Sequence, residues 1–196
     1  MRAPTAWSSA WRCELHGEVP PLLPPFRPSR DGLDGLLRLP GVPVLAPWPL
    51  PAGWLLAGFA AAGDERTGAR AAAVALGGPN PLGGPADMLV VAEEPGVGLG
   101  AALAGLGGVD PGAGFAATSP IATVSFGKHD FPLWQVDSPD RAVFAGEIKA
   151  LWLWLVLWPE GAGVLLIEPL ALRDLRDPGQ RLDLPFGAAS PRLPAP

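Results

Sequence analysis

Short apolar runs separated by turn residues recur along the chain from residue 54 onward. Trp54–Ala62 and Ala69–Leu76 flank the polar segment 63–68, and Asp87–Ala92 follows a second turn-rich stretch. Runs of this length, bounded by glycine and charged residues, are typical of strands rather than of long helices. We therefore expect a hairpin followed by a third strand.

The second half of the chain repeats this rhythm. Ile121–Phe126 and Phe131–Val136 flank a glycine-bearing loop, which predicts a second hairpin. Leu151–Trp158 carries leucines at one parity and mainly tryptophans at the other, so both faces of the strand must be covered. We expect it to be the central strand, returning through the turn 159–163 into Val164–Glu168 as a third hairpin.

One helix is predicted over Ser138–Lys149. Ser138 suits the N-cap, Pro139 the first helical position, and Asp140 adds an acid to the first turn. Three hairpins with one or two packed helices predict an α+β domain whose sheet is mainly antiparallel.

The N-terminal part differs in texture from the rest. A tryptophan-flanked Cys/His segment leads into the proline run 20–25, which favours an extended, semi-rigid spacer and could alternatively serve as a ligand for aromatic grooves. We expect an irregular N-terminal segment with its proline-rich linker over 1–38, the α+β domain over 39–184, and an irregular tail over 185–196.

Composition favours a folded chain. Glycine and proline number 26 each among 196 residues, yet 48% of the residues are hydrophobic and eight are tryptophan. Disorder requires too little apolar surface to offset chain entropy, and that condition is not met. The length suits one domain with a small appendage.

Charge and hydropathy exclude two classes of partner. A net charge of −5 argues against an electrostatic grip on nucleic acid, and in the basic segment 173–177 the signs alternate. The uncharged stretch Leu39–Gly63 is broken by prolines, leaving about twelve continuous apolar residues against the roughly 20 that span a bilayer. We expect no membrane insertion and no signal peptide. A single cysteine cannot form an intramolecular disulfide, so we expect a cytoplasmic protein.

Cys13 and His16 are the best candidates for metal ligands. They lie three residues apart and could form half of a zinc site, which needs four ligands in a tetrahedron. The chain holds no second cysteine, and its other histidine is His129. A buried free thiol beside Trp11 is the alternative reading.

Other candidate motifs are incomplete. The glycine-rich stretch 77–85 lacks the Gly-Lys-Ser/Thr ending of a phosphate loop, and Gly96–Ala101 lacks the acid about 20 residues on that a dinucleotide site uses. Ser125, His129 and Asp130 are close in sequence, but adjacent strand residues point to opposite faces. No catalytic residue and no nucleotide cofactor is predicted.

Several strings along the chain resemble an uncharacterised actinobacterial protein family of unknown function with a zinc-ribbon-like N-terminus. These are WRCELHG at 11–17, PWPLPAGW at 47–54, VAEEPGVGLG at 91–100, RAVFAGE at 141–147 and SPRL at 190–193. The resemblance implies a Cys-x2-Cys knuckle before Arg2-Ala3-Pro4, which this sequence does not contain. Residues 1–38 would then be a truncated ribbon, and zinc would bind Cys13 and His16 only with ligands upstream of Met1.

Two functions remain open. The first is a non-enzymatic cytoplasmic interaction or regulatory protein that meets a protein partner through exposed aromatic surface at Trp48 and Trp54. The alternative is a small-molecule enzyme, such as a phosphotransacetylase-like acyltransferase, a label that the resemblance carries for some members. It would shape its site from the loops 77–84 and 93–100. The sequence leaves the oligomeric state open.

Overall fold

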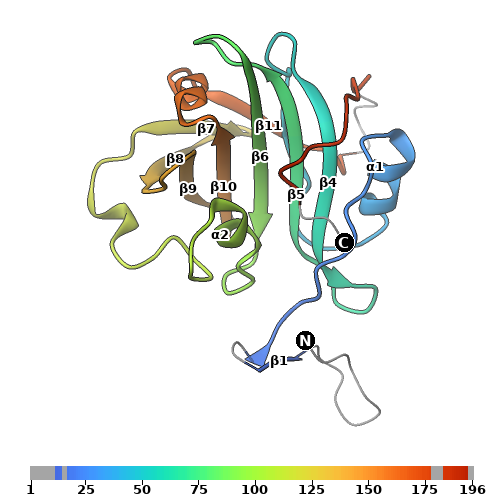
Figure 1. Cartoon of the computed structure of the whole chain (residues 1–196). Helices are drawn as coiled ribbons and strands as arrows, with labels where there is room; N and C mark the ends of the chain where they lie inside the picture. The colour runs from blue at the N-terminus through green and yellow to red at the C-terminus, as the bar shows by residue number, and fades with distance from the viewer. Residues whose placement is uncertain (1–11, 15–16, 178–182, 194–196) are drawn as a thin grey trace.

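A computed structural model describes residues 12–14, 17–177 and 183–193, and most of them belong to one large sheet (Figure 1). Its strands are β3 (Leu45–Pro47), β4 (Leu55–Asp64), β5 (Gly68–Pro79), β6 (Pro85–Glu93), β7 (Ala122–Phe126), β8 (His129–Val136), β9 (Ala142–Ile148), β10 (Leu151–Trp158) and β11 (Leu170–Asp174). The other elements are β1 (Arg12–Cys13), β2 (Gly17–Glu18), α1 (Arg30–Leu37), α2 (Leu99–Ala104), η1 (Phe115–Ala117) and η2 (Glu160–Leu166).

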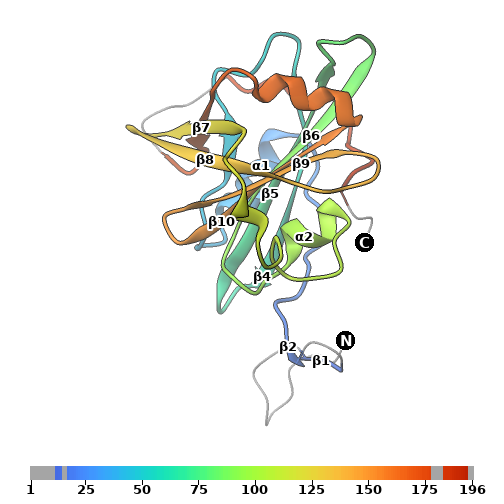
Figure 2. The same ribbon diagram turned by 90° about the vertical axis from the view of Figure 1, so that its left-hand side faces the viewer.

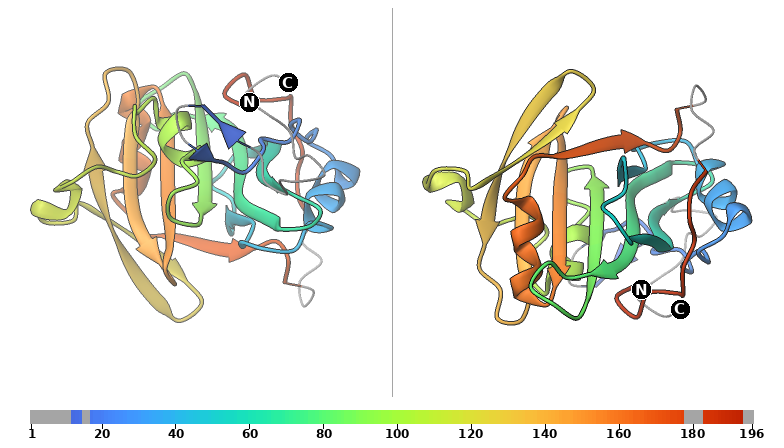
Figure 3. Two further views of the ribbon diagram at one scale, coloured as in Figure 1. Left: turned by 90° about the horizontal axis from the view of Figure 1, so that it is seen from below. Right: turned by 90° about the horizontal axis from the view of Figure 1, so that it is seen from above.

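The large sheet is mixed and curled. Its strand order is β3-β11-β7-β8-β9-β10-β6-β5-β4, and every neighbouring pair is antiparallel except β11 and β7, which run parallel. The curl carries β11 and β3 across the concave side, where β3 contacts β5 and β6 (Figure 3). The prediction of a sheet built from antiparallel hairpins is therefore right for most of the pairings, and the parallel pair makes the sheet mixed.

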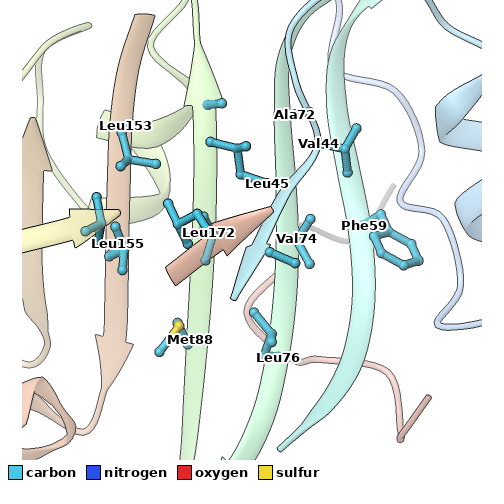
Figure 4. Close-up of a cluster of buried hydrophobic side chains, with 14 of the residues drawn as sticks. Val44, Leu45, Phe59, Ala72, Val74, Leu76, Met88, Leu153, Leu155 and Leu172 are labelled. Carbon is cyan, nitrogen blue, oxygen red and sulfur yellow. The ribbon is translucent and has the colours of Figure 1, made fainter. Parts of the chain in front are cut away.

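Apolar side chains fill both sides of this sheet. On the concave side, Leu45 and Leu172 of the crossing strands lie over Val74, Met88 and their neighbours (Figure 4). On the outer side, buried residues of β4, β5, β6 and β10 form a second cluster that α2 covers. Buried strands between two apolar layers need no alternation of polarity.

Strand β10 confirms the two-sided strand that the sequence predicts. Leu153, Leu155 and Leu157 join the concave core, whereas Trp154 and Trp158 join the outer cluster. The strand pairs with β6 on one side and β9 on the other. The hairpins β4–β5 and β7–β8 and the strand β6 also agree with the prediction.

The expected helix over Ser138–Lys149 is wrong, because β9 occupies most of that range. Ser138-Pro139-Asp140 is a local signal, whereas Val143 and Phe144 gain strand partners on both sides and are buried. Such tertiary pairing overrides local propensity.

The expected third hairpin is wrong as well. Residues 160–166 form the 3₁₀ helix η2, which buries Ala162 and Leu166. The chain then crosses to β11, which pairs with β3 and β7 and not with β10. Helix η2 follows the end of β10, whereas α2 packs on β10 and β6, where Gly100 meets the Trp154 ring (Figure 2).

The part of the N-terminal range from Leu22 onward lies against β4, whereas β1 and β2 lie apart from the large sheet (Figure 1). Leu22 and Phe26 form isolated bridges to Ala62 and Phe59 of that strand. Helix α1, which the sequence reading missed, starts at the N-cap Ser29 and packs on β4. The domain division at residue 38 stays a prediction.

The helices within the described ranges are short, α1 being the longest with eight residues. None of them has the length and apolar character needed to cross a membrane.

Candidate functional site

The structure does not describe the side chains of the two predicted metal ligands, Cys13 and His16. His16 lies outside the described residues, and Cys13 is placed only as part of β1, without its side chain. Within the part of the chain that the structure describes, no group of three or more His, Cys, Asp or Glu residues could hold a metal ion. The zinc half-site therefore stays a prediction.

The predicted contact residues are less exposed than the sequence suggested. Trp54 is only 3% exposed, because its ring fills the space above Gly78, where a Cβ atom would overlap the indole. The expectation of an exposed Trp54 is therefore wrong. Trp48 is half-buried and packs against the concave core.

The glycine-rich turn before α2 already contacts a carboxyl group of the chain itself. Glu93, the last residue of β6, is fully buried, and its Oε2 accepts a bond from the Gly100 amide at 3.1 Å. Its Oε1 accepts the indole Nε1–H of Trp154 at 2.7 Å. Burial raises the pKa of Glu93, while the bonds from Gly100 and Trp154 act in the opposite direction.

This carboxyl group accepts the Gly100 amide in the first turn of α2, and such amides are the donors that a dinucleotide phosphate uses in the fingerprint considered above. Gly100 is needed for packing, because a Cβ there would overlap the Trp154 ring. The structure thus gives Gly100 a packing role, and the expectation that no nucleotide binds at Gly96–Ala101 stays a prediction.

The remaining sequence candidates do not form a catalytic group. Ser125 pairs with Asp130, and His129 pairs with Phe126, at the exposed end of the β7–β8 hairpin. His129 contacts Phe131 edge-on. The stretch 77–85 forms the ends and the turn of the β5–β6 hairpin.

The candidate binding surface is hollowed and lies on the outer side of the sheet, where β6 begins and β10 ends. Two adjoining hollows of about 310 and 320 Å³ share Pro85 and Asp87 as lining residues. Together they run from Leu55 of β4 to Trp158 of β10 and form one groove. We call them the strand hollow and the tryptophan hollow, and call the pair the outer groove.

The strand hollow exists because its lining is small. Ala57, Gly77 and Ala86 contribute one methyl group or none, and a Cβ on Gly77 would make only ordinary contacts, with Asp87 Oδ1 at 3.9 Å and the Ala86 carbonyl oxygen at 4.0 Å. Residues 187–191 pass along the other side.

The tryptophan hollow gathers charge around an aromatic ring. Trp158 is the cross-strand partner of Asp87, and Asp140 also lines the hollow. The Arg192 guanidinium carbon lies 4.9 Å from the Trp158 ring centroid, and its Nε donates to Asp87 Oδ2 at 3.0 Å. Contacts of a guanidinium with an aromatic face and a carboxylate are both favourable.

A second arginine fixes the far wall of this hollow. The Arg141 guanidinium carbon lies 5.0 Å from the Trp158 ring centroid, and its Nη1 donates to the Leu103 carbonyl. Its Nε and Nη2 donate to the two carboxylate oxygens of Asp140. This hydrogen bonding by Arg141 lowers the pKa of Asp140.

Residues 185–190 reach the outer groove as a segment bound to β4, and the chain turns at Pro191 and Arg192. Leu56 and Phe186 form a parallel bridge, in which Leu56 N donates to the Pro185 carbonyl and Gly187 N donates to the Leu56 carbonyl. Further on, Ser190 N donates to the Ala57 carbonyl at 2.7 Å. The β4–β5 register skips Ala57, and this bulge turns its carbonyl toward the segment.

Sequence reasoning missed Asp87, Trp158 and Arg192 as members of one site. Arg192 lies 105 residues from Asp87, and only strand register and the returning tail bring them together. The string SPRL was noted as part of the family resemblance, which was the one available signal.

One family model matches residues 1–193 of the chain, and its description reads Family of unknown function (DUF6758). No curated protein and no solved structure matches the chain.

Proposed function

Since the chain belongs to the family of unknown function DUF6758, we infer its role from its own residues and propose that it is a non-enzymatic interaction protein. It binds an extended peptide segment along β4 and in the outer groove. Its single cysteine and net negative charge support a cytoplasmic role with a protein partner rather than nucleic acid.

One observation carries this proposal: the chain's own residues 185–190 lie on β4 as a peptide ligand would. Their backbone makes three hydrogen bonds with Leu56 and Ala57. Addition of an extended segment to a strand is a recurring mode of peptide recognition, in which main-chain bonds supply affinity and side-chain pockets supply specificity. Each such bond contributes about 0.5–1.5 kcal/mol net.

The polar groups of the outer groove suit binding better than catalysis. Both of its described carboxylates are hydrogen-bonded by arginine, Asp87 by Arg192 and Asp140 by Arg141. The Ser190 hydroxyl oxygen accepts the Arg192 amide. Among the described lining residues no histidine is available as a base, which nucleophilic catalysis by a serine needs.

The acyltransferase alternative receives no support from the loops assigned to it. Loop 77–84 lies before the first residue of β6, and loop 93–100 begins at its last. A strand of nine residues separates them by roughly 26 Å at about 3.3 Å per residue. They therefore do not shape a common substrate site.

The test is to loosen the segment in the full chain and offer it again as a separate peptide. Ser190→Pro removes the amide that donates to Ala57 and leaves every residue of β4 unchanged. A capped peptide copying residues 185–193 should then shift the amide signals of Leu56 and Ala57 saturably in NMR spectra. A scrambled peptide of equal composition is the control, and amide exchange in β10 verifies the fold. Absence of a saturable shift would overturn the proposed function.

A further inference from the structure

We infer that the tryptophan hollow is an arginine-recognition subsite, so that the peptide segments this protein binds carry an arginine, and that Arg192 fills the subsite in the free chain. This inference rests on the proposed function, because it names the side chain that the bound segment must bring to the groove.

The chemistry of the hollow matches a guanidinium group. Trp158 offers an aromatic face and Asp87 offers a carboxylate at its rim, and Arg192 uses both at once. A guanidinium is planar and weakly hydrated, so it stacks on a ring while donating sideways to a carboxylate. An ammonium group is compact and strongly hydrated, and it cannot make both contacts in this way.

The receptor side of the subsite is built without the tail. Trp158 is 6% exposed and Asp87 faces it across the β6–β10 pair. Arg141 holds Asp140 in place and is itself tied to Leu103 at the end of α2. The walls therefore come from β6, β10 and the chain before β9. Among the described lining residues, Arg192 is the one that the C-terminal segment contributes.

Arg192 occupies this subsite in an exchangeable way. Its side chain remains 39% exposed, and among the described residues only its Nε has a hydrogen-bond acceptor, which leaves both terminal nitrogens unpaired. Negative charge is close on the other wall too, since the charge of Arg192 helps to lower the pKa of Asp140. A ligand arginine could thus replace Arg192 without disturbing the core.

Pro191, the residue before Arg192, also favours exchange of the tail for an outside peptide. Pro191 lies in the turn that presents Arg192, and its ring fixes φ, which reduces the entropy lost on binding. A tail tethered in this way competes with outside peptides at an effective concentration of about millimolar. The free chain should therefore bind such peptides weakly until its own tail is displaced.

The experiment compares capped peptides copying residues 187–193 on the full chain carrying Arg192→Ala. One peptide keeps the arginine, and two others carry lysine or glutamine in its place. The readout is the NMR signal of the Trp158 indole N–H, assigned by its loss in Trp158→Phe. We expect the arginine peptide to bind about tenfold more tightly than either analogue, and about tenfold more tightly to the variant than to the unaltered chain.

A second substitution tests the carboxylate. Asp87→Asn added to Arg192→Ala should remove the preference for arginine while the peptide still binds β4. Arg192→Gln, which keeps an aliphatic stem, provides the same comparison if the alanine variant loses its fold.

The outcomes separate the two proposals. Equal binding of the arginine, lysine and glutamine peptides would overturn the arginine subsite and leave the groove as a peptide site. Failure of all peptides to shift the signals of β4 or Trp158 would overturn both. A tenfold preference that Asp87→Asn abolishes would support both.

Discussion

The indole Nε1 of Trp154 donates to Oε1 of Glu93 across 2.7 Å, and both side chains are fully buried. The bond joins β10 to the end of β6, where the same carboxylate also receives the amide of Gly100. One buried acid therefore ties two strands to the start of α2. A buried polar group costs free energy unless it is hydrogen-bonded, so this carboxyl group should dominate the local energetics.

Replacing Trp154 should expose this dependence. Trp154→Phe keeps an aromatic ring but removes the donor, and an unpaired buried acceptor costs about 1–3 kcal/mol of unfolding free energy. Trp152→Phe on the same strand is the matched control, because Trp152 is half-buried and makes a ring contact with Phe115. Urea unfolding of both variants measures the difference, and equal losses would contradict the assignment.

Glu93 should also make stability depend on pH in a defined direction. Burial raises its pKa above the ordinary value of 4.5, so the folded chain keeps a proton that the unfolded chain has released. The stability that this proton provides is complete below pH 4.5 and is lost as pH rises through the raised pKa. The difference in unfolding free energy between the unaltered chain and Glu93→Gln should therefore fall with pH across that window. A flat difference would show that Glu93 does not titrate as described.

Gly100 should tolerate no side chain. A Cβ at this position would overlap the Trp154 ring, and overpacking of this kind costs about 1–3 kcal/mol or more. Gly107→Ala is the control, since nothing lies within 4 Å of the methyl group that it would add. Thermal unfolding should show a lowered midpoint for Gly100→Ala alone. Similar midpoints for the two variants would contradict the close packing.

The turn between β9 and β10 offers a stabilising change. Lys149 and Ala150 both have positive φ, 50° and 62°, in a two-residue connection that favours Asn-Gly. Ala150→Gly removes left-handed strain and should stabilise the fold by about 0.5–1 kcal/mol.

Ala171→Gly is the opposite control for the turn variant. Ala171 is exposed within β11, where glycine should cost about 0.5–1 kcal/mol. Chemical denaturation of the two variants should give opposite signs. Destabilisation by Ala150→Gly would mean that the turn is not strained.

Local pattern was sufficient to predict the strands whose partners are near in sequence. The hairpins β4–β5 and β7–β8 are bounded by turn residues, and β10 is marked by apolar residues at both parities. Helix α1 escaped prediction because Gly32 and Gly35 lower its propensity, and its stability comes from burying Leu33 and Leu36.

Features that depend on distant pairing could not be predicted. The parallel alignment of β11 with β7 follows from the curl of the sheet and has no sequence signal near Leu170. The outer groove likewise depends on the register that sets Trp158 opposite Asp87 and on a tail that returns Arg192 to them. Sequence proximity brings together Ser125 and His129 instead, and in the structure these lie at the end of the β7–β8 hairpin, Ser125 half-buried and His129 exposed.

The outer edge of β4 obtains its neighbours from both ends of the chain, which has a consequence for biosynthesis. The backbone of Phe59 pairs with Phe26, which is synthesised early. The backbone groups of Leu56 and Ala57 gain their partners only when residues 185–190 have been synthesised. An unpaired strand edge is a template for association with other chains. Sedimentation of ribosome-released fragments ending before and after residue 190 would measure this exposure. We expect the nascent protein to be most prone to aggregation just before residues 185–190 emerge, because the backbone of this segment closes the edge of β4.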